Sequence, residues 1–247
     1  MFVDLILTHQ QIDVHAVRGK ICIVIDTLRA TSTIITALSR GCLEIIPVSS
    51  ATEALELKKH KYKNYLLGGE MEGQYLENFH LGNSPLEYCN GVPENKGLIL
   101  STTNGTRTLQ KVKNAGLILI CALLNVKTVG EWLSGQITDT VICCSGTRGN
   151  YSLEDFLTAG RLVTDLREHR TNFFFSDLAY TAACFYDYAR KSKKQENTIM
   201  EMLKTTDNGQ RLLKKGLEAD INYCGQEDVF SLLPFYENGS IKTGKIP

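Results

Sequence analysis

The fold is decided by the stretch Ile21-Cys22-Ile23-Val24-Ile25-Asp26-Thr27-Leu28-Arg29-Ala30-Thr31-Ser32-Thr33. Its first five residues are apolar and predict a strand. A polar turn follows, and the apolar residues after it, up to Gly41, recur at the spacing of an amphipathic helix. A strand that passes through a turn into a helix is the building unit of α/β proteins, so this stretch predicts an α/β fold.

A second stretch, Leu98-Ile99-Leu100-Ser101-Thr102-Thr103-Asn104-Gly105-Thr106-Arg107, has the same order of strand, polar turn and helix. In both stretches, hydroxyl groups, backbone N–H groups and one arginine lie where the strand passes into the helix. Phosphate, sulfonate and carboxylate groups bind well at such a point. The first turn also contains Asp26, and an anion site beside a carboxylate favours metal-assisted phosphoryl chemistry over simple anion storage.

Strands and helices are expected to alternate along most of the chain. The predicted strands lie near 2–8, 21–26, 43–48, 64–68, 97–101, 117–121 and 139–145. The predicted helices lie near 32–40, 51–60, 106–113, 126–134, 153–169, 176–190, 195–204 and 207–216. We therefore predict an α/β layered fold with a largely parallel or mixed sheet flanked by helices.

Residues 20–59 and 96–134 share one order of elements, which indicates two similar βαβα units. The alternative is that any two βαβα units look alike. No Ser/Pro-rich linker divides the chain, so we predict a single domain over 1–247, with 1–95 and 96–247 as its candidate sub-units. Residues 170–247 are predicted to be a helical elaboration with a short C-terminal tail.

The composition restricts the class of protein. The 247 residues carry 27 basic and 27 acidic side chains, and this neutral balance argues against nucleic acid as a partner. The N-terminus has no basic segment typical of a targeting signal, and no apolar run in the sequence reaches membrane-spanning length. The eight cysteines form no C-x-x-C pair, which predicts reduced thiols in a cytoplasmic protein. The five histidines lack the spacing of a zinc site.

Asp26 is the first candidate catalytic residue. It ends an apolar strand, and in α/β folds the carboxyl ends of the strands border the ligand crevice. It is suited to act as a nucleophile, as a general acid or base, or as a Mg²⁺ ligand. The alternative is a carboxylate that caps a helix or braces a loop. Arg29, also a candidate catalytic residue, and Arg107 are the expected clamps for anionic groups, with surface salt bridges as the alternative.

The two turns also provide candidate substrate-binding groups, namely Thr31, Ser32, Thr103, Asn104, Gly105 and Thr106. Helix capping is the alternative function of the hydroxyl groups, and one residue can serve both functions.

Three further acidic residues are candidate Mg²⁺ ligands alongside Asp26. Glu154 and Asp155 begin a helix that follows a small-residue turn, and helix capping is their alternative function. Glu70 lies in a glycine-rich loop. Arg148, in the turn before Glu154, is a further candidate for anion binding.

Three familiar signatures of phosphate chemistry are absent from the sequence. Haloacid dehalogenase-type phosphatases begin with D-x-D, but Asp26 is followed by Thr27 and Leu28. Cysteine phosphatases need five residues between the cysteine and the arginine, whereas Cys143 and Cys144 lie closer to Arg148. A nucleotide-binding P-loop is also missing. A phosphatase with this sequence is therefore of another kind.

Together these motifs resemble those of the 2-phosphosulfolactate phosphatase family. Besides the two turns, the resemblance rests on Gly69-Glu70, Leu81-Gly82-Asn83-Ser84-Pro85, Leu124-Asn125, Ser152-Leu153-Glu154-Asp155 and Ala159-Gly160. Through these motifs Asn83, Ser84 and Asn125 join the candidate substrate-binding residues. The sequence departs from the family pattern in the middle loop, at Met71 in place of arginine and at His80 in place of aspartate.

The resemblance implies Mg²⁺-dependent hydrolysis of (R)-2-phospho-3-sulfolactate to 3-sulfolactate and phosphate, a step toward coenzyme M in methanogens. Family members also occur in bacteria that need no coenzyme M, so another phosphorylated hydroxy acid is the alternative substrate. The three anionic groups of phosphosulfolactate match a site with Arg29, Arg107 and Arg148. Mg²⁺ held by Asp26, Glu70, Glu154 or Asp155 is expected to polarise the phosphoryl oxygens.

The sequence leaves the mechanism open between attack by water held on the metal and covalent attack by Asp26. Cys144 is less suited to attack, because no neighbouring base is evident. Two other functions also agree with the motifs: a non-catalytic anion-binding module, and a phosphotransferase with an acceptor other than water. A requirement for Mg²⁺ would discriminate against the binding module. A homodimer is the default expectation for an enzyme of this size.

Overall fold

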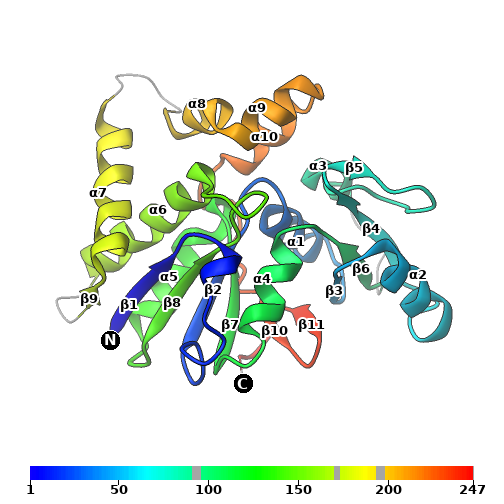
Figure 1. Cartoon of the computed structure of the whole chain (residues 1–247), viewed down its shortest axis with the longest axis horizontal. Coiled ribbons are helices and arrows are strands. Elements are labelled where there is room, and N and C mark those ends of the chain that lie inside the picture. The colour runs from blue at the N-terminus through cyan, green and yellow to red at the C-terminus, as the bar shows by residue number, and fades with distance from the viewer. Residues whose placement is uncertain (91–95, 170–172, 193–197, 247) are drawn as a thin grey trace.

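The computed structural model describes residues 1–90, 96–169, 173–192 and 198–246, which form a mixed sheet flanked by helices (Figure 1). The strands are β1 (Phe2–Ile6), β2 (Ile21–Ile25), β3 (Ile45–Val48), β4 (Leu66–Met71), β5 (Gln74–Tyr75), β6 (Leu98–Ser101), β7 (Leu117–Cys121), β8 (Thr140–Cys144), β9 (Phe174–Phe175), β10 (Phe235–Glu237) and β11 (Ser240–Lys242). The α-helices are α1 (Ala30–Ser39), α2 (Ala51–His60), α3 (Pro85–Tyr88), α4 (Gly105–Val112), α5 (Val126–Ser134), α6 (Leu153–His169), α7 (Asp177–Ser192), α8 (Thr198–Thr205), α9 (Asp207–Lys214) and α10 (Glu218–Cys224).

The predicted α/β layered fold with a mixed sheet is confirmed. Every strand and helix predicted from the sequence is present, with ends shifted by a few residues, although residues 195–197 of one predicted helix lie outside the described residues. The sequence does not predict the short elements β5, β9, β10, β11, α3 and α10. In the described parts of the chain, no helix is both long and apolar enough to cross a membrane.

The order of strands in the sheet is β5-β4-β6-β3-β11-β10-β7-β2-β8-β1-β9. On one side β7, β2, β8, β1 and β9 are parallel, and on the other side β3, β6 and β4 are parallel. The hairpin of β10 and β11 joins these two groups through antiparallel pairs, Phe235 with Leu119 and Ile241 with Ile45. Because three successive antiparallel pairings separate β7 from β3, the two groups run in opposite directions. The segment predicted to be a C-terminal tail is thus the central connection of the sheet.

Each parallel group contains strands from both halves of the sequence. β2 lies between β7 and β8, and β6 lies between β3 and β4. The chain passes from β2 through α1 to β3 in the other group, and from β6 through α4 back to β7. The two βαβα units therefore exchange strands, and α1 and α4 both lie in the middle of the molecule (Figure 1).

The hydrophobic core lies on both faces of the sheet. α1 and α4 contribute to a cluster on one face that includes Val24, Ile35, Leu100 and Leu109. On the opposite face α5, α6 and α7 pack against the group of β2, and α2 packs against the group of β6. Full burial of one large aliphatic side chain contributes about 1.5–3 kcal/mol to folding, so these layers supply the main force that holds the two groups in place.

The prediction that α1 is amphipathic is wrong, because every residue from Ala30 to Leu38 is buried. The hydroxyl groups of this helix donate to backbone carbonyls: Thr31 Oγ1 to Asp26 O at 2.9 Å, Ser32 Oγ to Thr27 O at 2.8 Å and Thr36 Oγ1 to Ser32 O at 2.8 Å. A buried helix tolerates polar side chains when such bonds are made. Two of these bonds also fix the turn after β2.

The helices α8, α9 and α10 form a cap over the end of the sheet where β2 ends (Figure 1, orange). They pack in a cluster around Leu28 that includes Leu203, Leu212 and Ile221. Leu28 belongs to the turn that follows β2, so the cap is fixed directly to the candidate site.

Candidate functional site

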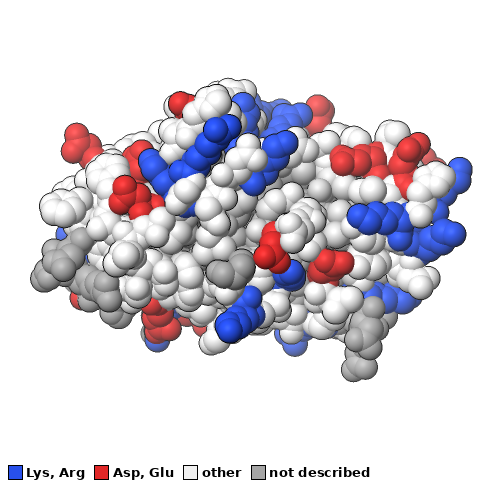
Figure 2. All heavy atoms as spheres, turned by 90° about the horizontal axis from the view of Figure 1, so that it is seen from below, with Lys and Arg blue, Asp and Glu red and all other residues white. Residues whose placement is uncertain are grey.

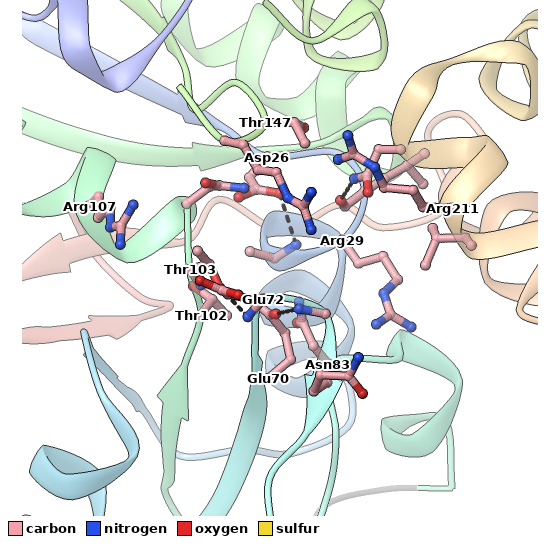
Figure 3. Close-up of a pocket in the computed structure, with 18 of the residues that line it drawn as sticks. Asp26, Arg29, Glu70, Glu72, Asn83, Thr102, Thr103, Arg107, Thr147 and Arg211 are labelled. Carbon is pink, nitrogen blue, oxygen red and sulfur yellow. Dashed lines mark hydrogen bonds between the residues drawn. The ribbon is translucent and has the colours of Figure 1, made fainter. Parts of the chain in front are cut away.

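A cavity of about 860 Å³ opens where β2 and β6 end. Its wall consists of the turns after these two strands, the β4–β5 hairpin, the loop after β8 and helix α9 (Figure 3). The residues that line it are Gln10, Asp26, Leu28, Arg29, Ala30, Glu70, Glu72, Gly73, Gln74, Asn83, Thr102, Thr103, Asn104, Arg107, Thr147, Arg148, Gly149, Asn208, Arg211, Leu212, Lys214 and Lys215. The cavity thus joins elements that are far apart in the sequence.

Asp26 lies at the point where two helices begin. The N–H group of Ala30, the first residue of α1, donates to Asp26 Oδ1 at 3.3 Å, and the N–H group of Gly105, the first residue of α4, also donates to the Asp26 carboxyl. A Cβ atom on Gly105 would lie 3.2 Å from Asp26 Oδ2 and 3.0 Å from the Ala30 Cβ. Helix N-termini carry partial positive charge, so the two turns predicted to bind anions converge on one carboxyl group.

The protonation of Asp26 is sensitive to its surroundings. Burial, together with the charges of Glu70 and Glu154, raises the pKa of Asp26 to about 7, although the N–H groups of Ala30 and Gly105 oppose the increase. A carboxyl group with a pKa near neutrality exchanges protons efficiently at physiological pH. Asp26 is therefore suited to proton transfer as well as to nucleophilic attack or metal binding.

Glu70 lines the cavity but its oxygens already accept hydrogen bonds. Glu70 Oε1 accepts from the Thr103 N–H at 2.9 Å and from Thr103 Oγ1 at 3.0 Å, and Oε2 accepts from the Gly73 N–H. Glu70 therefore fixes the β4–β5 hairpin to the turn that precedes α4. The preceding Gly69, with φ of +127°, lies against the Ser101 backbone, where a side chain would not fit.

The other two predicted metal ligands, Glu154 and Asp155, are buried and do not line the cavity. Asp155 accepts hydrogen bonds from the Thr27 N–H at 2.8 Å and from the Gly146 N–H at 3.1 Å, so it ties the turn after β2 to the loop after β8. Burial raises the pKa values of both carboxyl groups, and the two hydrogen bonds to Asp155 oppose the increase there. Both residues thus act on Asp26 through charge and through the position of its turn.

The arginines of the cavity differ in whether their side chains are paired with another residue. Arg29 forms an ion pair with Asp220 of α10, which also accepts a hydrogen bond from Ser84 Oγ at 2.6 Å. Arg107, Arg148 and Arg211 form no ion pair or hydrogen bond with any described residue through their side chains. Arg107 and Arg211 lie on opposite sides of Asp26 (Figure 3). Unpaired guanidinium groups in a cavity are available to bind carboxylate, phosphate or sulfonate groups.

The cavity concentrates positive charge. Arg29, Arg107, Arg148, Arg211, Lys214 and Lys215 line it, against Asp26, Glu70 and Glu72. The chain as a whole is neutral, and the face shown in Figure 2 carries both basic and acidic side chains among many uncharged ones. The excess of cations is therefore a property of the cavity, which is suited to a ligand with several negative charges.

Two amide oxygens at the cavity have no hydrogen-bond partner among the described residues. Asn83 Oδ1 and Asn104 Oδ1 are both buried, and both residues line the cavity. A buried polar atom without a partner is rare in folded proteins. The hydrogen-bonding capacity of both oxygens is therefore unused within the described part of the protein.

Eight of the predicted site residues line the cavity: Asp26, Arg29, Glu70, Asn83, Thr103, Asn104, Arg107 and Arg148. Thr31, Ser32, Ser84, Gly105, Thr106 and Asn125 lie behind this wall. Asn125, for example, accepts from the Ala122 N–H at 3.0 Å and donates to the carbonyl oxygens of Ile120 and Leu232 at 3.1 Å. In the described structure the side chains of Thr31, Ser32 and Asn125 hold backbone segments in position.

The two neighbouring cysteines at the end of β8, Cys143 and Cys144, have the properties of buried thiols. Burial raises the pKa of Cys144 well above its usual value, and the charge of Asp155 adds to the increase. Only the thiolate is a strong nucleophile, so this thiol is a poor candidate for attack on phosphorus.

Several lining residues that the sequence does not single out come from the cap. Asn208, Arg211, Lys214 and Lys215 line the cavity from α9. Their spacing of three and four residues places them on neighbouring faces of one helix. The regular spacing of these basic residues is visible in the sequence. Their direction is not, because it is the packing of the cap on Leu28 that turns them toward Asp26.

Comparison with known proteins identifies the family of the chain. The family model for 2-phosphosulpholactate phosphatase matches residues 6–239. A protein of Clostridium tetani named probable 2-phosphosulfolactate phosphatase is 39% identical over 242 residues, which cover 98% of this chain and 100% of that protein. Relatives with the same name come from Caldanaerobacter subterraneus (39% over 246 residues, 99% of both chains) and Clostridium acetobutylicum (37% over 241 residues, 98% of this chain and 100% of that protein). The chain therefore belongs to the 2-phosphosulfolactate phosphatase family and is a phosphoric monoester hydrolase.

Proposed function

We propose that the protein hydrolyses (R)-2-phospho-3-sulfolactate to 3-sulfolactate and phosphate in a reaction that requires Mg²⁺. The observation that carries this proposal is the position of Asp26, a buried carboxyl group at the N-termini of two helices inside a cationic cavity. The names of the relatives support the substrate.

The charge of the cavity agrees with a substrate of this kind. Phosphosulfolactate carries a phosphate, a sulfonate and a carboxylate on three adjacent carbons. The unpaired side chains of Arg107, Arg148 and Arg211 offer separate positions for such groups. A monoanionic substrate would leave most of these cations without a partner.

The residues that line the cavity fit a Mg²⁺ ion that has few protein ligands. Asp26 would supply a carboxylate, and the Oδ1 atoms of Asn83 and Asn104 are further oxygens of lining residues that have no hydrogen-bond partner among the described residues. Within the described residues, no three His, Cys, Asp or Glu side chains are grouped to hold a metal ion. Mg²⁺ usually takes only one or two carboxylates and completes its shell with water and substrate phosphate. When bound, it supplies positive charge that polarises the phosphoryl oxygens.

The role of Asp26 is to act directly on the phosphoryl group. In a covalent route, an Asp26 oxygen attacks phosphorus, the bond from phosphorus to the hydroxy-acid oxygen breaks, and water then hydrolyses the aspartyl phosphate. In a direct route, water attacks phosphorus while Asp26 accepts its proton. In both routes the hydroxy-acid oxygen leaves and gains a proton. Rapid acid quenching with ³²P-labelled substrate separates them, because only the covalent route labels the protein.

The experiment that tests the function is phosphate release from phosphosulfolactate, phospholactate and phosphoglycerate, with Mg²⁺ and with EDTA. We expect rapid release from phosphosulfolactate that is lost in EDTA. Faster release from phospholactate or phosphoglycerate would identify another phosphorylated hydroxy acid as the substrate. Tight, Mg²⁺-independent binding of these anions without release would favour the anion-binding module, which the family of the chain argues against.

A further inference from the structure

We infer that Arg211 and Lys214 of α9 bind the acidic group of the substrate that is not transferred, and that the cap thereby sets specificity for multiply charged phosphate esters. The inference rests on the proposed phosphatase function, and it concerns residues outside the two strand–turn–helix units that carry the sequence motifs. The repeated units supply the site for the phosphate, and the cap supplies a second site.

The position of α9 is fixed by several contacts. Asn208, in its first turn, donates a side-chain hydrogen bond to the Leu28 carbonyl oxygen. Leu212 packs in one cluster with Leu28. Thr206 caps the helix by accepting from the Gly209 N–H at 3.0 Å. The cations of α9 are therefore held at a defined distance from the turn that contains Asp26.

The cations of α9 differ in what they contact. Lys215 donates to the Gly73 carbonyl oxygen, so it joins α9 to the β4–β5 hairpin at the rim of the cavity. Arg211 and Lys214 line the same cavity, and no side-chain hydrogen bond or ion pair connects either of them to another described residue. Two unpaired cations next to a fixed rim are available to an anionic ligand.

Arg211 lies across Asp26 from Arg107 (Figure 3). Asp26 receives N–H groups from α1 and α4, and Arg107 belongs to α4. A phosphoryl group beside Asp26 and Arg107 leaves the Arg211 side for another anion of the same molecule. This arrangement matches a phosphate ester with an acid group on a neighbouring carbon.

The test compares wild type with Arg211→Gln on three esters: phosphosulfolactate, phospholactate, which lacks the sulfonate, and isopropyl phosphate, which lacks both acid groups. Loss of a charge-assisted hydrogen bond weakens binding by about 10- to 100-fold. We expect kcat/KM to fall by about that factor for phosphosulfolactate and by less than about threefold for isopropyl phosphate. The result for phospholactate assigns the second site to the carboxylate if activity falls, and to the sulfonate if it does not. Equal losses on all three esters would overturn the inference.

Calorimetric binding of 3-sulfolactate and of inorganic phosphate provides a second measurement that does not depend on turnover. Arg211→Gln should weaken 3-sulfolactate binding by about 10- to 100-fold and leave phosphate binding within about threefold. Equal weakening of both ligands would contradict the inference. If no ester is hydrolysed but sulfolactate binding is selectively weakened, the proposed function fails and the second site stands.

A matched control is Arg18→Gln, which removes the same charge from an exposed residue before β2 that does not line the cavity. It should leave all the rates and affinities within about twofold, because screened surface charges contribute little. Arg211→Lys retains the charge and should restore part of the loss. A change in thermal stability of Arg211→Gln without a selective change in binding would assign Arg211 a structural function instead.

Discussion

Arg29 and Asp220 form an ion pair inside the protein, although 191 residues separate them in the sequence. Their side chains are 10% and 2% exposed. The second Asp220 oxygen accepts a hydrogen bond from Ser84 Oγ at 2.6 Å, so α10 holds together the turn after β2 and the segment before α3. The cap therefore positions a cation of the active site as well as covering it.

Asp220→Asn should lower both activity and stability. Removal of one partner from a buried ion pair costs about 3–5 kcal/mol of folding free energy. We expect kcat/KM to fall by at least about tenfold, because Arg29 loses its fixed position. Chemical denaturation and steady-state kinetics measure the two effects. The double variant, Asp220→Asn with Arg29→Gln, should lose little more activity and stability than either single variant. Additive losses would show that the two residues act separately.

Asp26→Asn should reduce kcat by several orders of magnitude at saturating Mg²⁺, because the amide can neither attack phosphorus nor accept a proton. The measurement is phosphate release in a single-turnover assay. Retention of more than about a tenth of kcat would rule out Asp26 as nucleophile, base and essential ligand alike.

Asp26 should also make the metal-free protein less stable as the pH rises. Its pKa increases from the usual 3.8 to about 7 in the folded protein. Between these two values the unfolded chain loses the proton while the folded chain keeps it, so stability falls with increasing pH and levels off above about pH 7. The expected loss is on the order of 2–4 kcal/mol.

The measurement for this effect is denaturant unfolding in EDTA between pH 4 and pH 8, for wild type and for Asp26→Asn. The variant should show a flatter profile, since it has no proton to lose at this position. Parallel profiles would mean that other groups control the pH dependence. Mg²⁺ should stabilise wild type at pH 8 more than the variant.

Gly105→Ala should impair activity more than stability. The added Cβ would lie 3.2 Å from Asp26 Oδ2 and 3.0 Å from the Ala30 Cβ, so the Asp26 carboxyl group and Ala30 must shift by a few tenths of an ångström. Alanine favours the helix by up to about 1 kcal/mol, which offsets part of the strain. We expect kcat to fall by at least about tenfold, since a displacement of this size misaligns the reacting groups.

The control for this substitution is Gly130→Ala in α5, where the nearest atom to an added Cβ is at an ordinary contact distance of 3.4 Å, in Asp165. It should leave kcat unchanged. Equal losses in both variants would show that helix packing in general, and not the approach of α4 to Asp26, limits the reaction.

The local patterns of the sequence predict the strands, the longer helices and the anionic character of the ligand. They do so because apolar runs and polar turns depend on neighbouring residues alone. The hairpin of β10 and β11 is not predicted, since three-residue strands have little local pattern and depend on partners such as Ile45 and Leu119. The burial of α1 is missed because its hydroxyl groups, such as that of Ser32, bond to the backbone.

In the candidate site too, residues in local patterns are predicted from the sequence, and residues placed by distant contacts are not. Asp26 and Arg107 lie in turns with a clear pattern, and the structure places both at the cavity. Arg211 lies in a helix whose orientation is set by Leu28, far away in the sequence, so its part in the cavity is not visible in the sequence. Glu154 and Asp155 are close to Asp26 as the spacing suggests, but their oxygens face backbone and side-chain donors behind the wall.

The hairpin of β10 and β11 has a consequence for the synthesis of the protein. These strands follow all the other strands in the sequence, yet they are the ones that pair with both parallel groups of the sheet. A nascent chain that lacks them holds two sets of strands with an unpaired edge at β7 and another at β3. Folding of the whole sheet must therefore follow the synthesis of residues 235–242, and a premature stop near residue 230 would yield a chain with two open, aggregation-prone edges.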